Sequence, residues 1–276
     1  MALSLTIKRL LSNQPAELLV FHPVAMKLQE MLAEENFTIE EVIRLINDDP
    51  SLATQILKMA NSSYYGGRAR VETIKDAVVR LGAQQVSNLA LAVSQASLHA
   101  SDNPVLDRFM TDLWHHSHAC AVGCRWVAEH AGMRHLTEQA YMSGLLHDVG
   151  KLYLLKAVER LTKNGVATVA LEGEMMLEIF AELHAEQGAR ILRHWSLPEL
   201  YCSVAADHHL ASCAPDNQVL AIVRLVNAAC REAGLSLSSE PAVPLTTLPE
   251  LAVVGLSDLE CAELAVVLED TRGDEL

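Results

Sequence analysis

The chain has 276 residues, half of them hydrophobic, and a formal net charge of −14 at pH 7. Only 4% of the residues are aromatic, so a core would consist mainly of Leu, Ile, Val and Ala, which favours packed helices over a sandwich of short strands. The acidic balance and the scattered basic residues argue against direct nucleic-acid binding, whereas a small phosphorylated ligand needs only two or three well-placed cations.

The first hundred residues show helical periodicity. An amphipathic helix is indicated by apolar residues at i, i+3, i+4 and i+7, namely Ile39, Val42, Ile43 and Ile46. Asp49 is expected to cap the next helix, which begins at Pro50, where the missing N–H of proline costs nothing. Thr73 and Asp76 resemble a capping box that opens another helix. A long apolar helix is then predicted over about 84–99.

Longer helices are predicted in the second part of the chain. Their approximate ranges are 105–131, 137–158, 174–195, 200–209 and 216–233. The stretch 235–249 holds three prolines with several serines and threonines and predicts a loop. A capping box of Ser257 and Glu260 opens a last helix. That helix is expected to turn four residues inward, namely Leu259, Ala262, Val266 and Val267.

We therefore predict an all-α protein in three parts. Residues 1–103 form an N-terminal helical subdomain, 104–234 a helical core, and 235–276 a loop and a C-terminal helix. The N-terminus lacks the basic, apolar and small-residue order of a signal peptide, and no apolar run is long enough to span a bilayer. We expect a cytoplasmic protein whose six cysteines are reduced.

The histidines are the candidates for chemistry, since twelve of them occur and several are grouped. His115, His116 and His118 lie on one predicted helix, and Gly144 and Gly150 flank the pair His147-Asp148. Imidazole and carboxylate suit Zn, Fe, Mn, Ni and Co, and a helical bundle can bring such ligands together. Adjacent ligands on a helix point about 100° apart, so both reach one metal only where the helix passes close to it, as the small glycines would permit. Histidines that serve only as core residues stay an open alternative.

The order of these groups resembles the HD superfamily of metal-dependent phosphohydrolases, and the rest of the chain is similar to one branch of it, the HDOD family. The resemblance covers about residues 20–233. It rests on segments at 46–52, 57–66, 74–77, 81–82, 113–117, 144–152, 184–189, 195–198 and 208–209.

This resemblance implies a multi-helix HD-superfamily bundle preceded by an N-terminal helical subdomain, in a bacterial signal-transduction protein. It implies a divalent transition metal, Fe, Mn, Ni, Co or Zn. The positions that match its ligands are His116, His147, Asp148, His184, His208 and His209. Asp148 would also be catalytic in an active enzyme, and Lys151 matches a basic residue that can meet a substrate phosphate.

Two positions depart from the superfamily pattern. Its last ligand is an aspartate on a late helix, where this chain has Cys230. A thiolate there could ligate a soft metal, or Cys230 could be a buried apolar residue. The Gly-Tyr-Pro signature is absent after His208-His209, which argues against the cyclic-dinucleotide phosphodiesterase branch called HD-GYP.

Three functions follow as hypotheses. The first is a regulatory HDOD-type protein that retains a divalent-metal site. The second is a metal-dependent phosphohydrolase acting on a nucleotide or another phosphorylated small molecule. The third is a metal-free protein-interaction module whose first hundred residues form the binding surface. The expected partners are a phosphorylated small molecule or a signalling protein, without nucleic acid or membrane.

Overall fold

The computed structural model describes residues 5–34, 37–62, 65, 70–165, 173–210, 216–237 and 241–273. All regular structure in these residues is helical, which confirms the predicted all-α class. Contacts group the chain into a small unit, Val20–Leu98, and a large unit, Met1–Leu19 with His99–Arg272. The three-part division at residues 103 and 234 stays a prediction. No helix in the described ranges has the length and apolar character needed to span a membrane.

The small unit contains the four helices predicted between residues 39 and 99, and one helix before them that the sequence did not predict. They are α2 (Pro23–Ala33), α3 (Ile39–Asn47), α4 (Pro50–Ala60), α5 (Ile74–Leu81) and α6 (Ala83–Leu98). The predicted caps are confirmed, since Asp49 accepts a hydrogen bond from the Leu52 amide and Thr73 and Asp76 form a complete capping box. The apolar helix α6 is the centre of this unit, because it packs against α2, α4 and α5.

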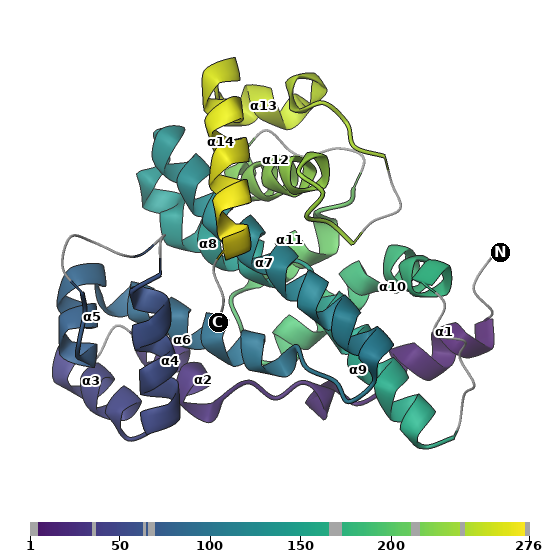
Figure 1. Cartoon of the computed structure of the whole chain (residues 1–276), viewed down its shortest axis with the longest axis horizontal. Coiled ribbons are helices and arrows are strands. Elements are labelled where there is room, and N and C mark those ends of the chain that lie inside the picture. The colour runs from purple at the N-terminus through teal and green to yellow at the C-terminus, as the bar shows by residue number, and fades with distance from the viewer. Residues whose placement is uncertain are drawn as a thin grey trace. The chain divides into compact units, whose positions relative to one another are not determined.

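The large unit is arranged around one long helix, α7. Its helices are α1 (Leu5–Ser12), α7 (Pro104–His130), α8 (Thr137–Leu146), α9 (Val149–Lys163), α10 (Gly173–His194), α11 (Glu199–Asp207), α12 (Gln218–Glu232), α13 (Pro249–Val254) and α14 (Asp258–Asp270). Short 3-10 turns lie at Ala16–Leu18, Arg134–Leu136, Leu245–Thr247 and Thr271–Gly273. Helix α7 packs against α8, α9, α12 and α14, and α10 packs against α9 and α11 (Figure 1).

The helix predicted over 137–158 is in fact two helices. Helix α8 ends at Leu146 and α9 begins at Val149, so His147 and Asp148 form the junction between them. The flanking glycines allow a close approach to the neighbouring helices, while the predicted approach to a metal stays a prediction. A Cβ on Gly144 would lie 2.6 Å from the Cys120 carbonyl oxygen on α7, and a Cβ on Gly150 would lie 1.9 Å from the His184 carbonyl oxygen on α10. The junction is therefore held close to both neighbouring helices.

The last helix, α14, has the predicted start and a different buried face. Ser257 and Glu260 form the capping box. The side chains that α14 buries are Cys261, Leu264 and Leu268. The expectation for Leu259 and Val266 is wrong, since 69% and 58% of these side chains are exposed. Ala262 is exposed as well, and Val267 is only partly buried. Apolar residues occur on several sides of this helix, so packing against α7 decides which of them are covered.

Candidate metal centre

Four histidines and one aspartate converge inside the large unit from separate segments of the chain. His116 lies in the middle of α7, His184 lies on α10, and His208 follows the last residue of α11. His147 and Asp148 come from the junction between α8 and α9. All five side chains are buried, with no more than 4% of any residue exposed. The structure thus brings together five of the six predicted ligands in a site shielded from bulk water.

The four imidazole rings are held by the same kind of hydrogen bond. In each ring Nδ1 lies next to a backbone carbonyl oxygen, which can only accept a hydrogen bond, so Nδ1 carries the proton and donates. The acceptors for His116, His147, His184 and His208 are the oxygens of Leu235, Gly144, Phe180 and Ala205, at 2.7, 2.8, 2.5 and 2.9 Å. The Nε2 atom of each neutral ring keeps its lone pair. This is the orientation that metal-binding histidines adopt.

All four Nε2 atoms surround the carboxylate of Asp148. Its Oδ2 atom lies 3.2 Å from Nε2 of His116 and 3.4 Å from Nε2 of His147. Its Oδ1 atom lies 3.4 Å from Nε2 of His184 and 3.5 Å from Nε2 of His208. We call His116, His147 and Oδ2 of Asp148 the first half-site. His184, His208 and Oδ1 of Asp148 form the second half-site. One carboxylate therefore lies between two pairs of imidazoles.

The two Nε2 atoms of each half-site lie within hydrogen-bonding distance of each other. The Nε2 atoms of His116 and His147 are 3.3 Å apart, and those of His184 and His208 are 3.2 Å apart. When both rings of a pair are neutral and protonated at Nδ1, as a metal site requires, neither Nε2 can donate to the other. Among the described residues, Asp148 Oδ1 also has no hydrogen-bond donor. A divalent cation would satisfy both features, and imidazole with carboxylate fits a transition metal.

The protonation states of His184, His147 and Asp148 agree with a ligand set, whereas His116 must lose a proton before it can bind a metal. Burial lowers the pKa of His184 to about 3 and that of His147 well below its usual value, so both rings are neutral at pH 7. Burial favours the neutral form of Asp148, but Lys151 and the histidines outweigh it and hold its pKa well below the usual range. For His116, burial is outweighed by hydrogen bonds to Asp148 and Cys230, which raise its pKa to about 9.

The two remaining predicted site residues lie at the edges of this centre. Lys151, on the first turn of α9, is 5% exposed and donates to Asp148 Oδ2 over 2.7 Å. His209 is exposed, and its ring centre lies 4.2 Å from that of His208 and 4.9 Å from that of His184. His209 is thus placed at the solvent side of the second half-site, and Lys151 balances the charge of the carboxylate.

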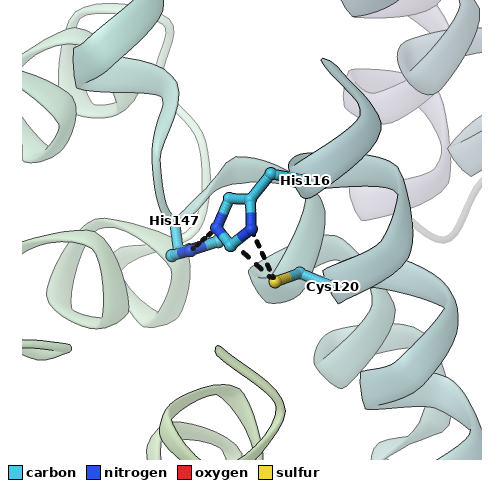
Figure 2. A group of neighbouring side chains, drawn as sticks. All are labelled: His116, Cys120 and His147. Carbon is cyan, nitrogen blue, oxygen red and sulfur yellow. Dashed lines mark hydrogen bonds between the residues drawn. The ribbon is translucent and has the colours of Figure 1, made fainter. Parts of the chain in front are cut away.

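Two thiols at this centre were not recognised as a pair from the sequence. Cys120 lies one turn after His116 on α7, and its Sγ atom is 3.7 Å from His116 Nε2 (Figure 2). Figure 2 also shows His147 directed toward the same ring from the other side. Cys230, on α12, is fully buried, and its Sγ atom lies 3.6 Å from that of Cys120. The i, i+4 spacing of His116 and Cys120 was the one local signal that could have indicated the contact between these two side chains.

Comparison with known proteins places the chain in a family. The model of the HDOD domain matches residues 18–211. The chain belongs to the HDOD family. An uncharacterised protein of Treponema pallidum (strain Nichols) is 26% identical over 199 residues, which is 69% of this chain and 37% of that protein. The chain therefore spans little more than a third of the length of this curated relative.

Solved structures share the HDOD fold. An HDOD domain protein of unknown function from Geobacter sulfurreducens has a TM-score of 0.72 at 23% identity, covering 93% of both chains. A Shewanella amazonensis protein, provisionally named as a metal-dependent phosphohydrolase, has a TM-score of 0.74 at 19% identity, covering 97% of this chain and 98% of its own. A Marinobacter aquaeolei protein, provisionally named as a signal transduction protein, has a TM-score of 0.69 at 19% identity, covering 96% of this chain and 63% of its own. At these identities the likeness concerns the fold.

Proposed function

We propose that this HDOD protein is a regulatory signal-transduction protein whose large unit binds a divalent transition metal, Fe, Mn, Ni, Co or Zn. The proposed ligands are His116, His147, Asp148, His184, His208 and His209. The observation that carries the proposal is the single buried carboxylate of Asp148, which is faced on each oxygen by the Nε2 atoms of two imidazoles.

The arrangement supports a site for two cations. Each half-site offers two imidazole nitrogens and one oxygen of Asp148, and three protein donors leave room for a further ligand. His209 adds a donor at the exposed side of the second half-site, within 4.8 Å of the ligand atoms of His184 and His208. Asp148 would then join the two half-sites, because both of its oxygens already face a pair of histidines.

Metal content tests this proposal directly. We expect about one or two equivalents of a transition metal in protein purified without chelator, since each half-site holds one ion. The double variant His147→Ala/Asp148→Ala should lose the metal because it removes donors from both half-sites. His135→Ala removes an exposed histidine outside the centre and serves as the control. If wild-type protein binds no metal after Mn, Fe, Ni, Co and Zn are each supplied, the proposal is wrong.

A metal-dependent phosphohydrolase is the second candidate, and Lys151 favours it. A bound metal would lower the pKa of a water molecule and polarise a phosphoryl oxygen. Lys151 holds a positive charge within 2.7 Å of Asp148, where it could stabilise charge that develops on a phosphate. In this function Asp148 and Lys151 are the catalytic residues. The substrate would be a nucleotide or another phosphorylated small molecule.

Phosphate release distinguishes the two candidates. Metal-loaded protein should be incubated with a panel of nucleotides and cyclic dinucleotides, and Lys151→Met should be measured beside it. Release that is lost in Lys151→Met with metal content unchanged would identify an enzyme. The absence of release from every compound at full metal occupancy would favour the regulatory function, with a signalling protein or a phosphorylated ligand as its partner.

A metal-free interaction module makes the opposite prediction for the same double variant. If a partner protein is captured through the small unit, His147→Ala/Asp148→Ala should bind it as well as the wild type does, because both substitutions lie in the large unit. A partner whose binding depends on the metal would instead connect the metal centre to signalling.

A further inference from the structure

A pocket in the large unit lies next to the first half-site. Its volume is about 360 Å³, within the range of roughly 300–1,000 Å³ that small-molecule sites occupy. Its walls are Asp112 and His115 of α7, the segment 234–237 that follows α12, and Arg272 beyond the end of α14. None of these residues belongs to the predicted ligand set, so the pocket is a separate site.

Two opposite charges line this pocket, namely the Asp112 carboxylate and the Arg272 guanidinium. Arg272 donates from Nη2 to the Ala233 carbonyl oxygen, which uses only part of a guanidinium that carries five N–H donors. Within the described part of the chain, neither Asp112 nor Arg272 forms an ion pair. Both charges are therefore available to a ligand.

The remaining wall of the pocket includes the apolar side chains of Leu235 and Leu237. A ligand with only a negative charge would meet the Asp112 carboxylate, in a chain whose net charge is already −14. A ligand with only a positive charge would meet the Arg272 guanidinium. A zwitterion satisfies both side chains, because an arginine can bind a carboxylate through two parallel hydrogen bonds and an aspartate can accept from an ammonium group.

The segment that lines the pocket also holds a proposed metal ligand. The Leu235 carbonyl oxygen accepts the hydrogen bond from His116 Nδ1 over 2.7 Å. The turn that carries Leu235 is fixed to the end of α12, since its amide donates to the Cys230 carbonyl oxygen over 2.8 Å and the Gly234 amide donates to that of Arg231 over 3.2 Å. The acceptor of Nδ1 sets the orientation of a metal-binding ring and the basicity of its other nitrogen. A displacement of Leu235 would therefore change how strongly His116 binds a metal.

We propose that this pocket binds a small zwitterion of the amino-acid class with an apolar side chain, and that the bound ligand alters the metal affinity of the first half-site through Leu235. Asp112 holds the ammonium group, Arg272 holds the carboxylate, and Leu235 and Leu237 contact the apolar part. Binding itself is independent of the metal, whereas the effect on the first half-site rests on the proposed metal-binding function. Such a ligand would be the input signal of the regulatory protein.

Calorimetric titration of the full-length protein tests the ligand class. The probes are L-valine, L-leucine, L-methionine and L-phenylalanine, each beside the amine that lacks its carboxylate and the acid that lacks its ammonium group. For leucine these analogues are 3-methylbutylamine and 4-methylpentanoate. We expect at least one amino acid to bind, and both of its analogues to bind about tenfold or more weakly, because each loses one charge-assisted contact.

Two single variants test the pocket residues. Asp112→Asn and Arg272→Gln should each weaken amino-acid binding by about tenfold or more. The matched control is Glu129→Gln/Arg134→Gln, which removes one exposed residue of each charge outside the pocket and should bind as the wild type does. Arg272 also holds the Ala233 carbonyl oxygen, so Asp112→Asn keeps the test decisive if Arg272→Gln disturbs the end of α12.

Cobalt titration against a competing chelator tests the link to the metal centre. A saturating amino acid should change the Kd for cobalt by about fivefold or more, and cobalt should change the amino-acid affinity by the same factor, because coupling between two sites is reciprocal. In His147→Ala/Asp148→Ala, amino-acid binding should persist without this coupling.

The outcomes that would overturn the inference are distinct from failure of the metal proposal. If none of the four amino acids binds, the pocket is not their site, and if an amine or acid analogue binds as tightly as its parent, the ligand is not a zwitterion. A cobalt Kd that is unchanged at saturation would refute the connection through Leu235. Protein that binds an amino acid but no metal would refute the metal-binding function and the coupling, and would leave the pocket assigned.

Discussion

Gly150→Ala should destabilise the large unit and disturb the metal centre together. Gly150 lies on the first turn of α9, where that helix contacts α10. A Cβ at this position would lie 1.9 Å from the His184 carbonyl oxygen and 2.7 Å from the Gly188 amide nitrogen. Both obstacles are backbone atoms, so no side chain can rotate away. The two helices would have to separate by about 1 Å, and overpacking of this kind costs typically 1–3 kcal/mol and occasionally more.

The cost at Gly150 should lie at or above the upper end of that range, because the backbone of a 22-residue helix has to move. A loss of about 3 kcal/mol corresponds to a fall of about 6–12 °C in Tm for a unit of this size. The same movement carries His184 away from Asp148 Oδ1, which lies 3.4 Å from its Nε2 atom. Metal affinity should therefore fall along with stability.

Thermal and urea unfolding followed by circular dichroism would measure the loss of stability. Metal content after dialysis would measure the loss of metal affinity. Gly173→Ala is the control, because Gly173 begins the same helix α10 and nothing lies within 4 Å of its added Cβ. That variant should be neutral or slightly more stable than the wild type. Equal midpoints for Gly150→Ala and Gly173→Ala would refute the proposed close approach of α9 and α10.

Three further predictions concern charge, pH and metal removal. Lys151→Met should destabilise metal-free protein by roughly 3–5 kcal/mol, because the buried Asp148 carboxylate loses its partner, and an unchanged urea midpoint would contradict this. Burial lowers the pKa of His184 to about 3, so below about pH 6.5 the unfolded chain binds a proton that the folded protein does not bind. The free energy of unfolding of metal-free protein should therefore fall as the pH is lowered from 6.5 toward 3. In urea titrations, His184→Gln should make this pH dependence weaker. Chelator treatment should lower Tm, since a cation at about 100 times its Kd stabilises the fold by about 2.7 kcal/mol; calorimetry should show no such change in His147→Ala/Asp148→Ala.

The sequence alone determined most of the helical elements and the residue types of the candidate site, but not helix α2 or the break between α8 and α9. Local signals were sufficient for the helix starts at Asp49, Thr73 and Ser257, because an N-cap acts within three or four residues of its own position. The residue types of the ligands could also be read directly, since grouped histidines beside an aspartate are uncommon and their order resembles the HD superfamily. The hydrogen bond from each histidine Nδ1 to a backbone carbonyl oxygen could not be predicted from the sequence, because it depends on where the tertiary structure places the ring.

The tertiary structure decided how these residues meet. It placed His147 and Asp148 at the junction of α8 and α9 rather than inside one helix, which lets a single carboxylate face histidines from α7, α10 and the end of α11. It brought Cys230 beside Cys120, and it selected Cys261, Leu264 and Leu268 as the buried face of α14. Sequence signals act over one helical turn, whereas these contacts join residues separated by tens to more than a hundred positions. Their geometry follows from how closely the helices pack, and that is fixed only when the glycines and side chains of all of them are in place.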